Sequence, residues 1–376
     1  MSSIHSIKKF FFILFSLSTL TFFSQENNHT LLQVEYFYGN ILKHKKKISH
    51  LAISNPQGFV ISYNRKTTAQ DKNLAHYNFP DWGFSFIYQD FNNTTLGKTF
   101  VAQLNYSFYF GNRANKNLFY LKLGQGIAYN TNPFNLETNN KNIAFGSHLL
   151  ANTTLGFNYK RKNILNAFDA TVGFTLSHYS NGTIKSPNLG LNTLSLITGV
   201  SYNFDADNPI DYNGPIQEDN IINKEPIKFN FQFSGGINSS GNIGTKQFPF
   251  YIGSIYADKR VGRKSILQFG GEIFISKFLK ELIAYNAVAF PELPNQDGKA
   301  DYKRVSLIVG HELDINNFSI LTQFGYYVYY PYPYETRYYE RVGVKKYFGK
   351  KWFATASIKA HLFLAESIDL GIGIRL

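Results

Sequence analysis

Apolar and polar residues alternate along most of the chain after the first 25 residues. In the segment 100–110 the even positions are apolar, while positions 103, 105 and 107 carry Gln, Asn and Ser. The closing segment 368–376 alternates in the same way, with apolar residues at its even positions. A period of two over about ten residues predicts β-strands, whose side chains point alternately to two faces. The same alternation predicts strands over 82–88, 149–159, 227–233, 267–275, 305–313, 318–330 and 352–362.

The length of these strands indicates the class of β-protein. We count 14 to 16 of them, and several run for about 10 to 13 residues, whereas strands of soluble proteins average about five or six. Aromatic residues make up 17% of the chain. These features predict an all-β fold, a transmembrane antiparallel β-barrel of the outer membrane with about 14 strands (range 12–16). The alternative is a large secreted β-sandwich, which would have shorter strands and fewer tyrosines on its inner face.

The beginning of the chain predicts export. Lys8 and Lys9 precede an apolar run over 10–23, and Ser24 stands before a polar stretch. This arrangement is typical of a secretory signal peptide, so we expect a signal peptide at 1–24 and a single outer-membrane β-barrel domain at 25–376. Two stretches lack the alternation. Residues 205–226 are predicted to be a long connection, and residues 277–302 to hold a short helix.

Composition and charge narrow the chemistry. The chain has no cysteine, which excludes thiol catalysis, thiolate metal sites and disulfides. Its formal net charge of +13 suggests an anionic partner. The most concentrated basic run contains Lys43, Lys45, Lys46 and Lys47. No aromatic interleaving or binding motif supports nucleic acid as the partner, so we expect these lysines to lie in a loop that faces anionic lipid.

One polar cluster interrupts an apolar strand face. In the predicted strand 170–180 the even positions are apolar up to Leu176, and His178 and Ser180 then continue the same face. In the next strand Asn192 begins a face that continues with apolar residues. In a membrane barrel the apolar face of each of these two strands is turned to lipid, where polar side chains are costly and usually functional. We therefore expect three polar side chains to gather at the lipid-facing ends of two neighbouring strands.

These three residue types match the parts of a serine esterase. Ser180 would be the nucleophile, His178 the base that takes its proton, and Asn192 the group that orients the imidazole. An amide orients the ring without adding a stabilising charge. The alternative is a His and a Ser that only bond each other at the level of the lipid head groups.

The string around these residues resembles the lipid A 3-O-deacylase (PagL) family of outer-membrane barrels. That family's motif runs His-x-Ser-Asn, then Pro-Asn-x-Gly, then an acidic residue. The matching positions here are His178, Ser180, Asn181, Pro187, Asn188 and Gly190. The resemblance implies catalytic roles for His178 and Ser180 and an oxyanion-site role for Asn188. Asn192 departs from the family, because it stands where the family has a catalytic Glu.

A second family shares part of the pattern. Outer-membrane phospholipase A also has His-x-Ser-Asn-Gly, with an orienting Asn fourteen residues after the His, as Asn192 is here. That resemblance would imply calcium and a homodimer. The Pro187–Gly190 segment favours the deacylase, for which we expect no cofactor. The expected function is thus removal of an ester-linked acyl chain from lipid A in the outer membrane of a Gram-negative bacterium. The alternatives are phospholipid hydrolysis and a non-catalytic pore or structural barrel that retains the motif.

Overall fold

A computed structural model describes residues 29–68, 71–212, 225–294, 297–315, 318–349, 351–362 and 364–376. The predicted signal peptide and most of the 205–226 connection lie outside these residues. Sixteen strands run through the described part, and nearly all the segments that alternation singled out are among them. They are β1 (Thr30–Leu42), β2 (Gln57–Arg65), β3 (Asp81–Asp90), β4 (Lys98–Phe110), β5 (Asn117–Asn130), β6 (Leu149–Leu165), β7 (Phe168–Ser180), β8 (Leu191–Asn203), β9 (Lys228–Asn238), β10 (Phe248–Arg260), β11 (Ser265–Ser276), β12 (Lys303–Ile315), β13 (Phe318–Tyr329), β14 (Tyr338–Phe348), β15 (Trp352–His361) and β16 (Leu364–Arg375).

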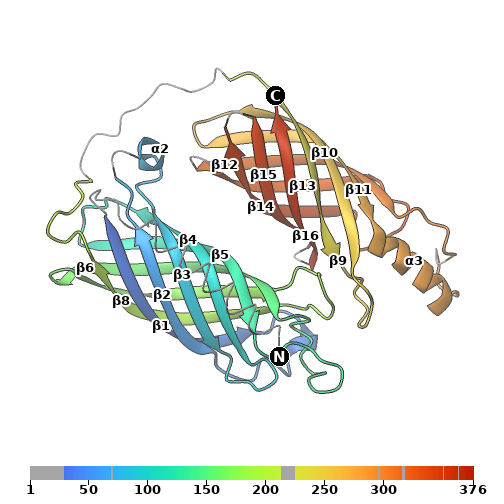
Figure 1. Cartoon of the computed structure of the whole chain (residues 1–376), viewed down its shortest axis with the longest axis horizontal. Coiled ribbons are helices and arrows are strands. Elements are labelled where there is room, and N and C mark those ends of the chain that lie inside the picture. The colour runs from blue at the N-terminus through green and yellow to red at the C-terminus, as the bar shows by residue number, and fades with distance from the viewer. Residues whose placement is uncertain are drawn as a thin grey trace, which may run out of the picture.

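The strands form two closed eight-stranded barrels (Figure 1). Each strand pairs antiparallel with the next, and β8 returns to pair with β1, which closes the first barrel. β16 pairs with β9 and closes the second. The all-β barrel class is confirmed, but the expectation of one barrel of about 14 strands is wrong. Alternation shows which face of a strand is apolar, and it does not show which two strands close the sheet.

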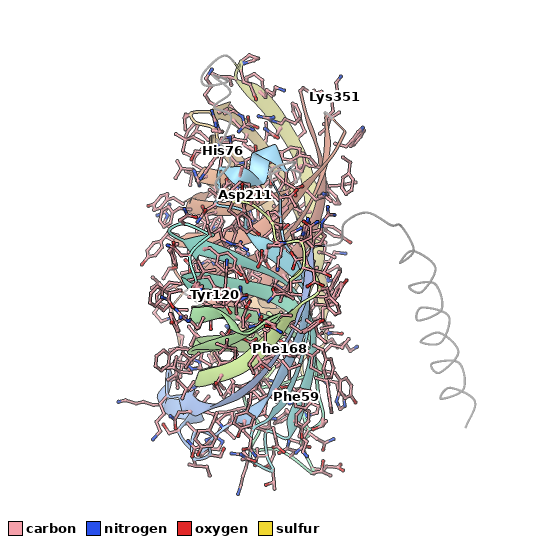
Figure 2. All side chains as sticks on the ribbon, turned by 90° about the vertical axis from the view of Figure 1, so that its left-hand side faces the viewer. Phe59, His76, Tyr120, Phe168, Asp211 and Lys351 are labelled. Atoms are coloured by element: carbon pink, nitrogen blue, oxygen red, sulfur yellow. The ribbon has the colours of Figure 1, made fainter. Side chains whose placement is uncertain are left out.

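Side chains follow the in-and-out alternation of a membrane barrel (Figure 2). Phe59 and Phe168 lie on outer faces and are 38% and 42% exposed, whereas Tyr120 points inward and is 1% exposed. The outer faces carry most of the large exposed apolar residues, and the lumens hold the buried polar ones. Such an apolar outer band is what a lipid environment requires.

Side chains occupy both lumens. In the first barrel Lys122 bonds Glu35 at 3.1 Å, beside a cavity of about 30 Å³ that has room for about one water molecule. The second barrel holds a set of buried ion pairs, among them Arg304–Glu366 at 2.6 Å and Lys345–Glu312 at 2.6 Å. Eight-stranded barrels are narrow enough for side chains to fill. A larger cavity, of about 850 Å³, lies at the end of the first barrel opposite Ser180, where Asp81, Tyr109, Lys160 and Asp169 line it. Side chains fill the middle of each lumen in the described residues, which argues against the pore alternative.

The short helix expected within 277–302 is present as α3 (Lys277–Ala289), which follows β11 directly. Two shorter helices, η2 (Lys46–Ile48) and α2 (Lys72–Ala75), lie in loops of the first barrel. None of the helices in the described residues is long and apolar enough to cross a membrane.

The two barrels touch at both ends. At one end the hydroxyl of Tyr77 bonds the carbonyl of Asp314. At the other end, which we call the Ser180 end, Thr183 Oγ1 donates to the carbonyl of Ala365 at 2.5 Å. Most of the long connections lie at the Ser180 end of the two barrels, namely 43–56, 131–148, 181–190, 239–247, 277–302 and 330–337, whereas the connection 66–80 lies at the opposite end of the first barrel.

Candidate active site

The pairing of β7 with β8 brings two of the three predicted residues together. His178 lies directly opposite Asn192 in the register. Both are on the outer face, as the alternation predicts, and both are half-buried. Nδ1 of His178 lies 2.6 Å from Oδ1 of Asn192. Opposite side chains on adjacent strands are close enough for such a bond, so the register alone assembles this pair.

The bond to Asn192 sets the proton arrangement of the imidazole. An amide oxygen only accepts hydrogen bonds, so Nδ1 of His178 must carry the proton and donate it. In a neutral ring the lone pair is then on Nε2. His178 is therefore in the tautomer that a general base needs.

Ser180 lies two residues further along the same face of β7. It is 5% exposed, and its Oγ accepts a long hydrogen bond of 3.4 Å from the N–H of Gly182. Gly190 has a φ of +68° and packs against the pair: a Cβ there would lie 3.1 Å from Cε1 of His178 and 3.4 Å from Cβ of Ser180. Among the described residues no hydrogen bond joins Ser180 to His178. Catalytic hydrogen bonds often tighten only when substrate binds.

Asn188 lies in the β7–β8 loop (residues 181–190) and helps to shape it. Its Oδ1 accepts from the backbone N–H of Asn181 at 2.9 Å. Asn181 in turn donates from its side chain to the carbonyl of Lys185 at 2.7 Å and to Ser147 Oγ at 3.1 Å. The amide nitrogen of Asn188 makes no hydrogen bond within the described residues. Asn188 thus contacts the residue that follows Ser180 and has a side-chain donor left for a ligand, and an oxyanion site requires such donors.

The basic run begins next to the site. Leu42, the last residue of β1, lies opposite Asn192 in the pairing of β1 with β8. The loop that starts at Lys43 therefore begins beside Asn192. Lys43, Lys46 and Lys47 are exposed and Lys45 is half-buried.

Lys45 lies within electrostatic range of the second barrel. The pKa of Lys45 is lower than its ordinary value. Burial is the main cause and the charge of Lys47 adds to it, while the carboxylate of Glu335 in the β13–β14 loop offsets part of the effect. In the same segment, Nε2 of His44 lies 3.3 Å from the carbonyl oxygen of Leu189. The first long loop and the β7–β8 loop are therefore in contact.

The sequence did not indicate which loop residues fix the β7–β8 loop against the second barrel. Gly182, Thr183 and Ser186 contact the second barrel, through Ser239 and Ile368 among others. Gly182 is the one with a visible signal, since it directly follows the His-x-Ser-Asn string. The described residues contain no group of three or more His, Asp or Glu side chains that could hold a metal ion.

Two family models match the chain, one on each barrel. The model "Lipid A 3-O-deacylase (PagL)" matches residues 57–201, from the start of β2 to near the end of β8. The model "Acyloxyacyl hydrolase, C-terminal domain" of the same family matches residues 227–376, which is the second barrel. The boundary between the two matches coincides with the boundary between the barrels.

The chain is also similar to parts of solved structures. The outer-membrane enzyme PagL is 16% identical, with a TM-score of 0.31, over 44% of this chain and 97% of its own. Neisserial surface protein A is 11% identical, with a TM-score of 0.31, over 46% of this chain and 97% of its own. The sequence matches none of the curated proteins. The family models cover both barrels and include the His178–Asn192 region. The chain belongs to the lipid A 3-O-deacylase (PagL) family of β-barrels in the outer membrane of Gram-negative bacteria.

Proposed function

We propose that the protein is a serine esterase that removes an ester-linked acyl chain from lipid A. The observation that carries the proposal is the 2.6 Å bond between His178 and Asn192, with Ser180 on the same lipid-facing side of β7. The family match to a lipid A 3-O-deacylase gives the substrate class. A site on the outer wall of a barrel meets its substrate within the membrane, where acyl chains lie.

The residues divide the work as follows. Nε2 of His178 takes the proton of Ser180, and Oγ of Ser180 attacks the ester carbonyl carbon. Asn188 Nδ2 and backbone N–H groups of the β7–β8 loop stabilise the negative oxygen of the tetrahedral intermediate. The intermediate collapses, the sugar oxygen leaves with the proton from His178, and the acyl group stays on Ser180. Water, activated by His178, then releases the fatty acid and restores the serine.

The placement of the loops supports access to lipid A. Outer-membrane barrels have short periplasmic turns and longer extracellular loops, and most of the long loops lie at the Ser180 end, with 66–80 as the exception in the first barrel. β7 is the seventh strand, so a chain that enters from the periplasm runs outward along it. The site then lies in the outer leaflet, where lipid A is found. We propose that Lys43, Lys45, Lys46 and Lys47 attract its phosphates.

Phospholipase A-type hydrolysis is the second candidate. Asn192 matches the orienting Asn of the phospholipase, whereas the deacylase motif has a Glu at this position. The test is a comparison of substrates. Purified protein is incubated with lipid A micelles and, separately, with phosphatidylethanolamine vesicles, each with and without EDTA, and released fatty acid is quantified. We expect release from lipid A that EDTA does not suppress and that Ser180→Ala abolishes. Release confined to phospholipid and dependent on calcium would overturn the deacylase in favour of the phospholipase.

A further inference from the structure

The β7–β8 loop of the first barrel is held by the second barrel. Thr183 Oγ1 donates to the carbonyl of Ala365 at 2.5 Å, and the carbonyl of Thr183 accepts from the N–H of Ser239 at 2.9 Å. The backbone N–H of Ser186 donates to Ser239 Oγ at 3.1 Å, and Ser186 Oγ donates to the carbonyl of Ser240 at 2.6 Å. These partners come from the ends of β9 and β16, more than fifty residues away in sequence.

The contact is buried and closely fitted. Ser186, Ser239 and Ser240 are each less than a tenth exposed. A Cβ on Gly182 would lie 2.2 Å from Cγ1 of Ile368, which points outward from β16. Ile368 of the second barrel can come this close only because residue 182 is a glycine. Gly182 is also the residue whose N–H bonds Ser180.

The loop also adopts a backbone conformation that needs such support. Thr183 has a φ of +68°, which is rare for a β-branched residue. Backbone conformations of this kind persist when the surrounding structure fixes them. Here the hydroxyl and the carbonyl of Thr183 each form a hydrogen bond with the second barrel.

The loop connects these contacts to the site. Asn181 lies between Ser180 and the anchored Gly182–Ser186 segment, and it bonds both Lys185 and Asn188. A shift of the anchored segment therefore moves Asn188 and the Gly182 N–H relative to Ser180.

We propose that the second barrel is part of the catalytic apparatus, because Ser239, Ala365 and Ile368 position the β7–β8 loop so that its donors face the acyl carbonyl on Ser180. Thr183, Ser186 and Ser239 are positioning residues in this account. The inference rests on the proposed function for its substrate, and it adds a role for the second barrel in the reaction at the first.

The test uses the full chain and a matched pair of variants. Thr183→Ala loses the hydroxyl that bonds Ala365, while Thr183→Ser keeps it. Ser239→Ala and Ile368→Ala change the second barrel alone. Ser254→Ala, which removes a buried lumen hydroxyl bonded to Glu272 in the same barrel, is the control. Folding of each variant is checked by its heat-dependent migration on a denaturing gel.

We expect the double variant Thr183→Ala/Ser239→Ala to lose about tenfold to a hundredfold in kcat for lipid A, with KM within about twofold, because small displacements of catalytic groups cost this much. Thr183→Ser and Ser254→Ala should keep near-normal kcat, and Ile368→Ala should fall between. A folded double variant with kcat within about twofold of the parent would overturn the inference. If the double variant does not fold, an unchanged kcat in the folded single variants Thr183→Ala and Ile368→Ala overturns it.

A second readout separates this inference from the proposed function. The rate at which a fluorophosphonate probe labels Ser180 reports the same donors without any lipid substrate. If the parent protein does not cleave lipid A, the substrate assignment fails, and a tenfold lower labelling rate in the double variant still supports the positioning role. Equal labelling rates in the parent and the double variant would refute that role.

Discussion

Replacement of Asn192 by alanine perturbs the site at the residue where this chain departs from its family. Asn192→Ala removes the acceptor that lies 2.6 Å from Nδ1 of His178. The barrel should still fold, because Asn192 is on the outer face and only half-buried. The expected defect is therefore in kcat and not in the amount of folded protein.

The magnitude follows from the change in charge on the ring. A hydrogen bond between neutral groups contributes about 0.5–1.5 kcal/mol, and one to a charged group about 1.5–3 kcal/mol. In the proposed mechanism His178 is neutral before the reaction and positively charged in the transition state, so the bond would stabilise the transition state by roughly 1–1.5 kcal/mol more than the ground state. That difference is about a tenfold effect on kcat. Free rotation of the ring adds to it, and we expect a loss of about 10- to 100-fold.

The assay compares four variants with the parent on lipid A micelles. His178→Ala removes the base itself and should cost more than Asn192→Ala, in the range of about 10²–10⁴-fold or beyond. Asn192→Glu supplies the residue of the family motif and should equal or exceed the parent, because a carboxylate stabilises the imidazolium by charge. Thr198→Ala, on the same outer face of β8, is the control. An Asn192→Ala enzyme that matches the parent would show that another group orients His178.

Three further predictions follow from the same structure. Gly190→Ala should reduce kcat by at least tenfold without unfolding the barrel, because φ is +68° there and the new Cβ would press on His178; steady-state kinetics checks this, and normal kcat would contradict the packing described. Neutralising the four lysines of the Lys43–Lys47 run should raise KM for lipid A at low salt and leave kcat nearly unchanged, and the difference should vanish at high ionic strength because salt screens exposed charges; a salt-independent KM defect would refute long-range attraction. Glu366→Ala leaves Arg304 and Lys359 buried without their carboxylate and should destabilise the second barrel by about 3–5 kcal/mol. The variant should unfold at a lower temperature on gels, whereas Glu292→Ala in an exposed loop should not. Equal unfolding temperatures would contradict the role of the ion pairs.

Much of the fold could be predicted from the sequence because alternation is a local property. The alternation around Leu176 and Leu194 placed His178, Ser180 and Asn192 on the outer face, and their strands run as expected. The helix within 277–302 was visible for the same reason, since the alternation stops there. The opposite positions of His178 and Asn192 followed from a hairpin of two neighbouring strands.

The division into two barrels could not be read from the same pattern. Closure depends on the pairs β1–β8 and β9–β16. A strand that pairs with one distant in sequence shows the same alternation as a strand that pairs only with its neighbours in sequence. The lumen residues carried a weak signal. Tyr120, Lys122, Arg304 and Arg341 are large side chains that fill the interior of a narrow barrel, although such residues also line wide channels.

The contacts that hold the β7–β8 loop are equally invisible in the sequence. Thr183 and Ser186 are unremarkable loop residues until Ser239 and Ala365 are placed against them. Such contacts depend on how the two barrels meet, which is a tertiary property that residue patterns do not encode locally.

The most direct test of the central claim is mass spectrometry of lipid A from cells that produce the protein. Three strains are compared: one without the gene, one with the parent protein, and one with Ser180→Ala at equal amounts of folded barrel. We expect lipid A to lose the mass of one ester-linked acyl chain only in the strain with the parent protein. Lipid A of unchanged mass in that strain, or the same loss in the Ser180→Ala strain, would contradict it.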